Sequence, residues 1–474
     1  MGNKFVDELK AIREHIKKVY IELRRPFIIG FSGGKDSTMT LQLVWEALNE
    51  LNSKDLTNPI HVISTDTLVE TPFFISHIND SIEKINIAAK DQHLPISAHK
   101  LTPEFSNSFW VNLIGKGYPA PSQTFRWCTD RMKIKPVNKF IQENVQLSKE
   151  VVVVLGARKD ESISRAQVIE NKEKNASRLG LTMHPDLMGT LVYTPISELK
   201  TDKVWLYLNM TQNPWGADNK ILQSMYQIGS DDAECPTVVD DKTASCGNSR
   251  FGCWVCTVVS KDTSMENVIK ENGNEWMERL LSFRNMLKDT IKPENKSKYR
   301  SHKRRNGKVS LVRDGSKIAY GPYKFEYRKK FLEEILDIQH EIQNHHRKKD
   351  FKIIHEDELK EIRLIWLKEE YDWSDTVKSL HSKYSQNNDI FDSFELIFDQ
   401  EDLLELSKIC NEKDVDFNLV ARILNLEVSM NQNSSSLKSR RIKEIENIFL
   451  EDWKTEEEIL EELRSGQFKI EGSS

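Results

Sequence analysis

The feature that constrains this chain most is a glycine turn between a short apolar run and a helical pattern. FIIGF at residues 27–31 has the apolar composition of a strand buried on both faces, and SGG at residues 32–34 follows it directly. After KDS at residues 35–37, the segment TMTLQLVWEALNEL at residues 38–51 has the period of a helix. A strand, a glycine turn and a helix in this order predict the first unit of an α/β fold.

Three further apolar runs have the length and composition of buried strands. They span residues 60–64, 96–101 and 151–156, and helical patterns lie between them. Strands that alternate with helices predict a parallel sheet with helices on both faces. Ligands of such folds bind at the carboxyl ends of the strands, so the informative residues are expected directly after these runs.

The length of 474 residues is enough for several domains, and the composition changes along the chain. The strand pattern comes first, a cysteine-bearing stretch follows, and the last part is increasingly acidic and helical. We predict an α/β domain at residues 1–205, a four-cysteine module at 206–280, a basic region at 281–355 and an acidic, mainly helical region at 356–474.

The formal net charge of −5 argues against a uniformly basic nucleic-acid-binding protein, but the charge is unevenly distributed. Residues 281–355 carry 20 Lys and Arg against 9 Asp and Glu, whereas residues 356–474 carry 15 against 29. Basic side chains suit the phosphates of DNA, and Tyr299 adds a ring that can stack on a base. The same stretch also fits a solvated loop or a dock for the acidic tail. The candidate DNA-binding residues are Lys298, Arg300, Lys303, Arg304 and Arg305.

No feature of the sequence points to a membrane or to export. The chain has no run of about eighteen apolar residues, and its first residues, MGNKFVDELK, lack an apolar segment. We therefore expect a cytoplasmic protein with no membrane partner. In a reducing compartment, its six cysteines do not predict a disulfide framework.

The SGGKDS turn combines the groups that bind a polyphosphate. Glycines allow backbone N–H groups to approach an anion, the start of a helix adds partial positive charge, and Lys35 adds a full charge. The adjacent glycines and the Asp36-Ser37 pair distinguish this turn from the GxxxxGKS/T loop of other nucleotide-binding proteins. A plain strand-to-helix turn with Ser32 as the helix cap is the alternative interpretation.

This turn resembles the PP-loop of the ATP pyrophosphatases, which implies their adenine nucleotide alpha hydrolase-like fold. The resemblance implies binding of ATP with Mg²⁺, cleavage between the α and β phosphates, and catalytic roles for Lys35 and Asp36. Sulfonucleotide reductases share the fold but commonly lack the lysine, so Lys35 favours ATP as the substrate. The ATP-binding residues expected in the loop are Ser32, Gly33, Gly34, Lys35, Asp36 and Ser37.

Later segments resemble the phosphoadenosine phosphosulfate (PAPS) reductase-like branch of this family. GARKDESISRAQ at residues 156–167 resembles its G-x-R-x-x-E-S-x-x-R segment, which implies that Arg158 and Arg165 bind phosphate oxygens. ISTDTLVETP resembles the segment whose acid lies near the nucleotide, which makes Asp66 a candidate nucleotide or magnesium contact. PISELKTDKVWLYL resembles a third segment, with Leu199 where tryptophan is usual. The alternatives are that Arg158 and Arg165 are surface charges and that Asp66 caps a turn.

Four of the six cysteines fall within residues 235–256, with the spacing C-x10-C-x6-C-x2-C. Four thiolates suit an iron–sulfur cluster or tetrahedral zinc, and the uneven gaps differ from the paired knuckles of a zinc ribbon. We predict a [4Fe-4S] cluster, with zinc as the alternative metal. Cys410 stands alone at helical spacing and is expected in a core. The predicted cluster ligands are Cys235, Cys246, Cys253 and Cys256.

Cys128 lies in TFRWCTDRMKIKP, where four basic residues are close in sequence. Nearby cations stabilise a thiolate over a thiol, so Cys128 is the predicted catalytic sulfur nucleophile. The segment resembles the R-x-C-x-x-x-R-K-x-x-P motif of PAPS reductase-like proteins, and in sulfur-inserting relatives a cysteine here is expected to carry a persulfide. The alternative is an inert, buried cysteine in a basic loop.

In combination, the loop, the reductase-like segments and the cysteines resemble the DndC family, the sulfurtransferases of bacterial DNA phosphorothioation, over roughly residues 1–330. The resemblance implies that ATP activates a backbone phosphate and that sulfur replaces a non-bridging oxygen. The implied partners are DNA, a cysteine desulfurase as sulfur donor, and DndD-like and DndE-like subunits. A PAPS or APS reductase, a tRNA thiolation enzyme and a non-enzymatic cluster-bearing DNA-binding subunit remain alternatives.

Overall fold

The computed structural model describes residues 2–145, 150–161, 163–174, 177, 179–185, 187, 189–229, 252–271, 273–346, 348–385, 389–391, 400–431, 438–451 and 453–465. The chain divides into two compact units. Unit 1 consists of Met1–Glu104 and Pro121–Asn285, and unit 2 consists of Phe105–Ala120 and Met286–Ser474. A short segment between two parts of unit 1 therefore belongs to unit 2, whereas the predicted division into four regions stays a prediction.

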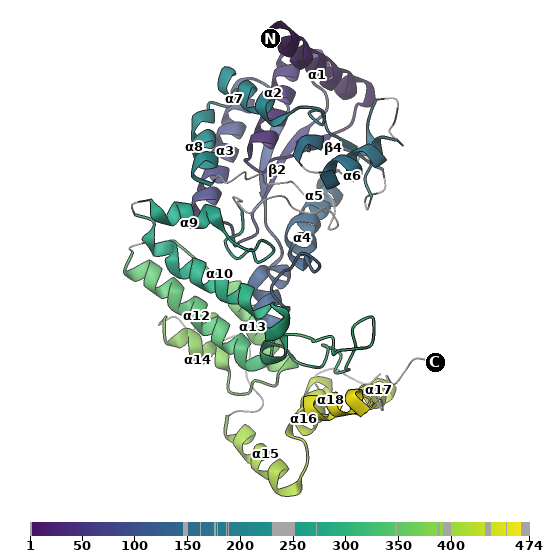
Figure 1. Ribbon diagram of the computed structural model, residues 1–474, viewed down its shortest axis with the longest axis vertical. Coiled ribbons are helices and arrows are strands. Elements are labelled where there is room, and N and C mark those ends of the chain that lie inside the picture. The colour runs from purple at the N-terminus through teal and green to yellow at the C-terminus, as the bar shows by residue number, and fades with distance from the viewer. Residues whose placement is uncertain are drawn as a thin grey trace. The chain divides into compact units, whose positions relative to one another are not determined.

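Unit 1 contains a six-stranded, mostly parallel sheet (Figure 1). Its strands are β1 Phe27–Gly30, β2 Ile60–Thr65, β3 Ile96–Leu101, β4 Val151–Val154, β5 Thr182–Met183 and β6 Thr190–Tyr193. Their spatial order is β3-β2-β1-β4-β6-β5, and only the β5–β6 pair is antiparallel. The strand order reverses between β1 and β4, so their carboxyl ends form the switch point at which open α/β sheets bind ligands.

Helices cover both faces of this sheet, as predicted. The helices of unit 1 are α1 Gly2–Leu23, α2 Lys35–Asn49, α3 Pro72–Asp91, α4 Trp127–Thr129, α5 Lys135–Val145, α6 Ile163–Glu173, α7 Thr201–Met210, α8 Asn219–Gly229, α9 Thr263–Lys270 and α10 Glu278–Thr290, which runs on into unit 2. Phe27 and Ile29 share a core with α1, α2, α3, α7 and α8. Ile28 and Val153 enter the opposite core, with Phe140 of α5. Strands buried on both faces need apolar residues throughout, which explains the FIIG and VVVV runs.

The four predicted strands are confirmed with small shifts of their ends. β1 ends at Gly30 and β4 at Val154, slightly before the ends of the apolar runs, because the chain turns there into the switch point. The sequence analysis did not predict β5 and β6. Strands of two and four residues are too short to establish a period, so their pairing with the sheet decides their conformation.

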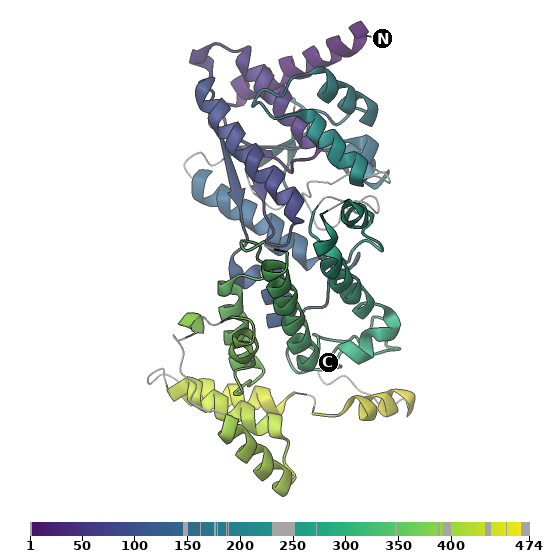
Figure 2. The same ribbon diagram turned by 90° about the vertical axis from the view of Figure 1, so that its left-hand side faces the viewer.

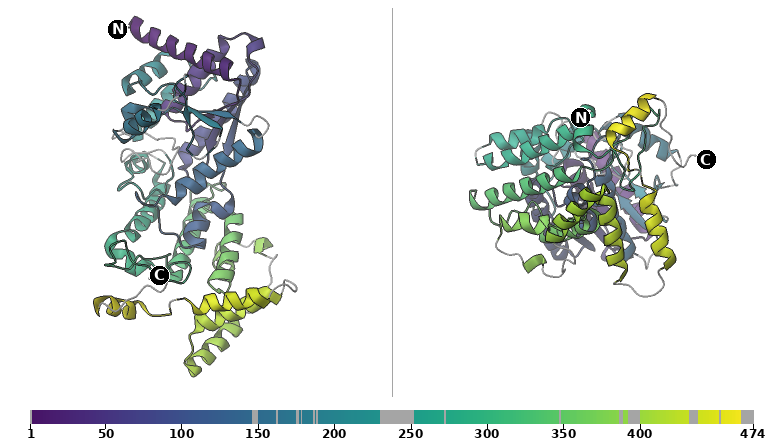
Figure 3. Two further views of the ribbon diagram at one scale, coloured as in Figure 1. Left: turned by 90° about the vertical axis from the view of Figure 1, so that its right-hand side faces the viewer. Right: turned by 90° about the horizontal axis from the view of Figure 1, so that it is seen from below.

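Unit 2 contains the predicted helical C-terminal region. Its helices are α11 Lys296–Tyr299, α12 Phe325–Asn344, α13 Glu356–Glu369, α14 Thr376–Ser382, α15 Gln400–Lys413, α16 Phe417–Asn431, α17 Lys438–Phe449 and α18 Glu456–Ser465. Helix α16 packs against both α15 and α17 (Figures 2 and 3). Cys410 of α15 is buried, as expected. None of the described helices has the length and hydrophobicity that crossing a membrane requires.

The segment Phe105–Ala120 belongs to the core of unit 2. Trp110 is fully buried, and its indole N–H donates to the carbonyl of Ile353 at 2.7 Å. Trp366 of α13 donates to the carbonyl of Ile114 at 3.0 Å. Indole N–H groups pair with carbonyls when buried, so these contacts fix the segment in the helical unit.

Candidate active site

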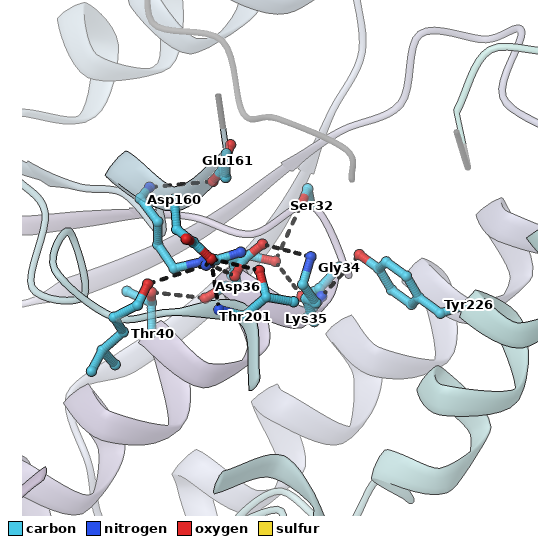
Figure 4. A network of polar contacts seen from close by, with 12 residues as sticks. Ser32, Gly34, Lys35, Asp36, Thr40, Asp160, Glu161, Thr201 and Tyr226 are labelled. Carbon is cyan, nitrogen blue, oxygen red and sulfur yellow. Dashed lines mark hydrogen bonds and ion pairs between the residues drawn. The ribbon is translucent and has the colours of Figure 1, made fainter. Parts of the chain in front are cut away.

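The turn after β1 places the predicted phosphate-binding residues at the switch point. Lys35 is the first residue of α2, and the N-cap residue Gly34 makes no side-chain capping hydrogen bond (Figure 4). Lys35, Asp36 and Ser37 are all buried, which is unusual for polar side chains and requires local pairing. The Ser37 hydroxyl donates to the carbonyl of Gly34 at 2.9 Å and lies 3.1 Å from that of Ser32. Helix N-termini of this kind favour anionic ligands.

Both glycines of the turn are required by their surroundings. Gly33 has φ of +71°, and a Cβ atom there would lie 2.5 Å from Cδ1 of Ile78. A Cβ atom on Gly34 would lie 2.9 Å from the hydroxyl of Tyr226. The positive φ requires glycine at position 33, whereas a side chain on Gly34, which has φ of −85°, would displace the hydroxyl end of Tyr226.

Tyr226 of α8 reaches the same turn and was not predicted. Its hydroxyl accepts a hydrogen bond from the backbone N–H of Lys35 at 3.2 Å, and its ring centroid lies 5.2 Å from Nζ of Lys35 (Figure 4). The two residues are 191 positions apart in the sequence. A single tyrosine in an amphipathic helix carries no signal of its own, so only the tertiary structure brings it to the site.

Asp36 is held by a buried arginine from the other side of the switch point. Nε of Arg158 donates to Oδ1 of Asp36 at 2.6 Å, and Nζ of Lys35 lies 3.4 Å from Oδ2 of Asp36. Arg158 is fully buried and also donates to the carbonyl of Leu199 at 3.1 Å. The structure thus gives Arg158 a role in orienting Asp36, while its predicted contact with phosphate stays a prediction. A Cβ atom on Gly156 would lie 2.7 Å from the carbonyl oxygen of Asp36, so the approach of the two segments also depends on glycine.

The other predicted nucleotide contacts lie near different strand ends. Asp66 directly follows β2, where one oxygen accepts from the N–H of Leu68 at 2.9 Å and the other lies 3.5 Å from Nζ of Lys100. These contacts fit the turn-capping alternative, and a magnesium role stays a prediction. Arg165 falls in α6, and its side chain lies outside the described part of the structure.

Two of the four predicted cluster ligands are described, and they lie in one turn beyond β2. Cys253 pairs with Glu70 in an antiparallel bridge, and the N–H of Cys256 donates to the carbonyl of Cys253 at 3.1 Å. The hydroxyl of Thr67 lies 3.2 Å from the sulfur of Cys253. Cys235 and Cys246 lie outside the described residues.

The turn that carries Cys253 and Cys256 is called the cysteine turn below. Its surroundings fit a further bound group. Oε2 of Glu70 and the hydroxyl of Thr71 are buried without a hydrogen-bond partner in the described ranges. Both residues line the bridge that carries Cys253. Within the described residues, no three His, Cys, Asp or Glu side chains are arranged as a complete metal site. Two thiols from a C-x2-C turn fit part of the predicted cluster, whose remaining ligands fall in the undescribed segment.

Cys128 belongs to the same neighbourhood. It lies in α4, directly before a π-helical turn at Asp130–Ile134, a feature often found at functional sites. The hydroxyl of Thr257 donates to the carbonyl of Pro121 at 2.6 Å, which joins the cysteine turn to the segment that leads to Cys128. Cys256 contributes to the electrostatic environment of Cys128, and Lys133 acts on both Cys128 and Cys253.

Burial of Cys128 opposes the thiolate that its basic sequence neighbours favour. Burial raises the pKa of the Cys128 thiol to about 11, the nearby Cys256 adds to the increase, and Lys133 offsets it only in part. The loss of hydration raises the pKa of this thiol more than the single nearby cation lowers it. Cys128 is therefore a protonated thiol at neutral pH, and its activation needs a change in its surroundings.

Alkylation of the metal-free protein is expected to be slow at Cys128. With a pKa of about 11, the thiolate fraction at pH 8 is about 10⁻³. The alkylation rate should therefore rise about tenfold for each pH unit from pH 7.5 to 9.5. Peptide mass spectrometry after timed iodoacetamide treatment measures this rate, with the Cys128→Ser protein as the control. A rate that levels off below pH 8 would contradict burial as the dominant cause.

Comparison with known proteins gives this arrangement a family context. Residues 26–259 match the sequence model of the family described as "Phosphoadenosine phosphosulfate reductase domain". These residues, which are similar to that family, are called the PAPS reductase-like domain below. The match includes the SGGKDS turn at residues 32–37, called the phosphate turn below. It also includes the switch point and the turn with Cys253 and Cys256.

Two individual proteins also resemble this chain. Uncharacterized protein MJ0066 of Methanocaldococcus jannaschii is 26% identical over 280 residues, which are 59% of this chain but only 45% of that protein. The chain therefore spans less than half of the length of this relative. The U34-tRNA thiolase NcsA from Methanococcus maripaludis, solved with its [4Fe-4S] cluster, aligns with 14% identity over 62% of this chain and 82% of its own chain, at a TM-score of 0.29.

The candidate DNA-binding residues lie outside the PAPS reductase-like domain, in unit 2. They flank or belong to a small hairpin in which Arg300 bridges to Tyr323, Lys303 to Val309 and Leu311 to Ile318. Lys298, Arg304 and Arg305 are exposed. Arg300 turns inward, and its Nε donates to the carbonyl of Gly321 at 2.7 Å. The structure thus brings the five residues together but directs Arg300 to the backbone of the hairpin.

Helix α18 of the acidic tail packs on the same hairpin. Ile459 is fully buried in a small core with Val309 and Ile318. The hydroxyl of Tyr320 donates to Oε1 of Glu456 at 2.7 Å. These contacts support the alternative in which the basic region docks the acidic tail, and they leave Lys298, Arg304 and Arg305 at the surface.

Proposed function

We propose that this chain is an ATP-dependent sulfurtransferase that inserts sulfur into the DNA backbone as a phosphorothioate. The observation that carries the proposal is the buried Lys35 at the start of α2, beside Gly33 and Gly34 at the switch point of the sheet. A polyphosphate bound there meets backbone N–H groups, the positive end of a helix and a lysine. A sulfonucleotide without a triphosphate does not need this lysine.

The first step is activation of a DNA phosphate. A non-bridging phosphate oxygen attacks the α-phosphorus of ATP, and the bond to the β-phosphate breaks with release of pyrophosphate. Lys35 and the N–H groups of the turn stabilise the charge that develops on the leaving pyrophosphate. Asp36, whose Oδ1 accepts from Nε of Arg158 at 2.6 Å, would help to hold the Mg²⁺ that accompanies ATP.

The second step is sulfur transfer. A cysteine desulfurase loads Cys128 with a persulfide, whose terminal sulfur attacks the activated phosphorus and displaces AMP. The remaining S–S bond is then cleaved with two electrons from a thiol reductant, which leaves the phosphorothioate and free Cys128. Since the pKa of the resting Cys128 thiol is raised by burial, loading as a persulfide, which ionises more readily, suits this position.

The cysteine turn completes the proposed site. Cys253 and Cys256, with Cys235 and Cys246, would hold a [4Fe-4S] cluster, which supplies structural cross-linking or electron transfer when bound. DNA would reach the protein through Lys298 and Arg304, which are exposed, and through Arg305, whose guanidinium also pairs with Glu369 at 2.5 Å. DndD-like and DndE-like subunits would complete the modification complex.

Mass spectrometry of DNA tests this proposal directly. DNA from cells that contain the protein and its partners is digested, and phosphorothioate dinucleotides are quantified. We expect phosphorothioates with the wild-type protein and none with Cys128→Ser, whereas Cys410→Ala, a change at the buried cysteine of α15, retains them. Phosphorothioates that persist in Cys128→Ser, or that are absent with the wild-type protein, would exclude the proposed role.

A sulfonucleotide reductase is the second candidate, because residues 26–259 match the PAPS reductase domain. Such an enzyme would release sulfite from PAPS or APS in the presence of a thiol reductant, without cleaving ATP. Sulfite formation with purified protein, compared with pyrophosphate formation from ATP and DNA, separates the two functions. We expect pyrophosphate, because Lys35 is retained and buried in the phosphate turn.

A further inference from the structure

Arg284 of α10 is fully buried and directs its guanidinium into the chain that follows Cys256. Its Nε donates to the carbonyl of Cys256 at 2.8 Å, and Nη2 donates to the carbonyl of Val259 at 2.6 Å. Nη1 donates to the carbonyl of Ser260 at 3.3 Å and to Oδ1 of Asn285 at 2.9 Å. Three carbonyls within five residues therefore converge on one side chain.

This convergence fixes the backbone direction at Cys256. Carbonyls that point to a common donor force the intervening chain to curl around it, and a planar guanidinium meets several of them at once. A lysine offers a single nitrogen and cannot replace all three bonds. Burial of the charge makes these bonds costly to lose, because the guanidinium would otherwise be left without partners.

The same turn is anchored on two other sides. The buried hydroxyl of Thr257 donates to the carbonyl of Pro121 at 2.6 Å, on the segment that leads to Cys128. The N–H of Trp254 donates to the carbonyl of Val69 at 3.0 Å, beyond β2. Arg284 is therefore a third anchor of the turn, and it bonds directly to the backbone of the predicted ligand residue Cys256.

We propose that Arg284 is a positioning residue for the cysteine turn and that its hydrogen bonds hold Cys253 and Cys256 in the conformation that binds the cluster. The proposal rests on the cluster assigned under the proposed function. Arg284 does not touch the reacting atoms, so its loss acts through the position of the two thiols. Residues that orient metal ligands typically change metal affinity about 10–100-fold when they are replaced.

Iron release from the anaerobically prepared full-length protein tests this role. The protein is mixed with a ferrous chelator, and the loss of iron and of the cluster absorbance is followed over time. We expect Arg284→Lys to lose iron at least about tenfold faster than the wild-type protein. Asn285→Ala, which removes one bond to the guanidinium at an exposed position, should cause a smaller acceleration. The exposed variant Lys270→Arg, which keeps its positive charge as Arg284→Lys does, serves as the matched control and should behave as wild type.

The readout separates a local role from general unfolding. Arg284→Lys is expected to keep the far-ultraviolet circular dichroism of the wild-type protein while its iron is released faster. An iron-release rate in Arg284→Lys equal to that of the wild-type protein would overturn the proposal. If Arg284→Lys does not fold, a rate in Asn285→Ala equal to that of the wild-type protein would overturn it. Wild-type protein that contains no iron would instead count against the cluster of the proposed function.

Discussion

Replacing Lys35 by alanine is expected to slow the release of pyrophosphate from ATP by about 10²–10³-fold, the usual effect of removing one group that stabilises developing negative charge. Lys35 lies at the first position of α2, beside Gly33 and Gly34, and is 1% exposed. Its charge is therefore shielded from water, and it interacts both with Asp36 at 3.4 Å and with a bound phosphate. A coupled assay for pyrophosphate, with DNA and partner proteins present, measures the rate.

Two further variants make this result specific. Lys35→Met keeps the volume of the buried side chain and should be as slow as Lys35→Ala, because the charge is lost in both. Lys84→Ala removes an exposed lysine of α3 that pairs with Asp80 at 2.8 Å, and it should leave the rate unchanged. Wild-type activity in Lys35→Met would show that the turn does not bind the cleaved phosphates.

Replacing Arg158 by methionine is expected to lower the free energy of unfolding of unit 1 by about 3–5 kcal/mol. The change removes the 2.6 Å bond to Asp36 and leaves this buried carboxylate with Lys35 alone, at 3.4 Å. A buried charge that loses its partner still carries the free-energy cost of its desolvation. A well-packed apolar pair in the same place carries no such cost. Urea denaturation followed by circular dichroism measures the change, as a shift of the unfolding transition to lower urea concentration.

A double variant and a surface control test this cause. Arg158→Met combined with Asp36→Leu should recover much of the lost stability, because both charges are then absent. Arg13→Met breaks the partly exposed pairs with Glu46 and Glu50, at 3.2 Å and 2.9 Å, and should cost less than about 1 kcal/mol. A loss in Arg158→Met no larger than that in Arg13→Met would show that the buried pair is not a major source of stability.

The local sequence was sufficient for the strands and the phosphate turn. FIIG and VVVV are apolar at every position, and only strands buried on both faces need this composition. Gly33 and Gly34 were predicted to allow close approach of an anion, and both glycines prove necessary for the packing of the turn. Such features depend on neighbours in sequence, so they can be read without the fold.

Other properties of the site depend on groups that are distant in sequence. Arg158 is 122 residues from Asp36, and its basic character alone suggested a phosphate contact, whereas the structure pairs it with the carboxylate. The four cations near Cys128 suggested a lowered pKa, but burial raises that pKa to about 11. Desolvation depends on everything that surrounds a group, and adjacent residues do not reveal it.

The sequence by itself therefore determined the α/β class, the phosphate turn, the cysteine-bearing stretch and the separation of basic and acidic regions. Each of these depends on local composition or spacing. The tertiary structure alone decided that Tyr226 and Arg158 complete the phosphate turn, that Arg284 anchors the turn of Cys253 and Cys256, and that α18 packs on the basic hairpin. These contacts join residues far apart in the chain, because the sheet brings its carboxyl ends to one edge and burial then selects the partner of each charge.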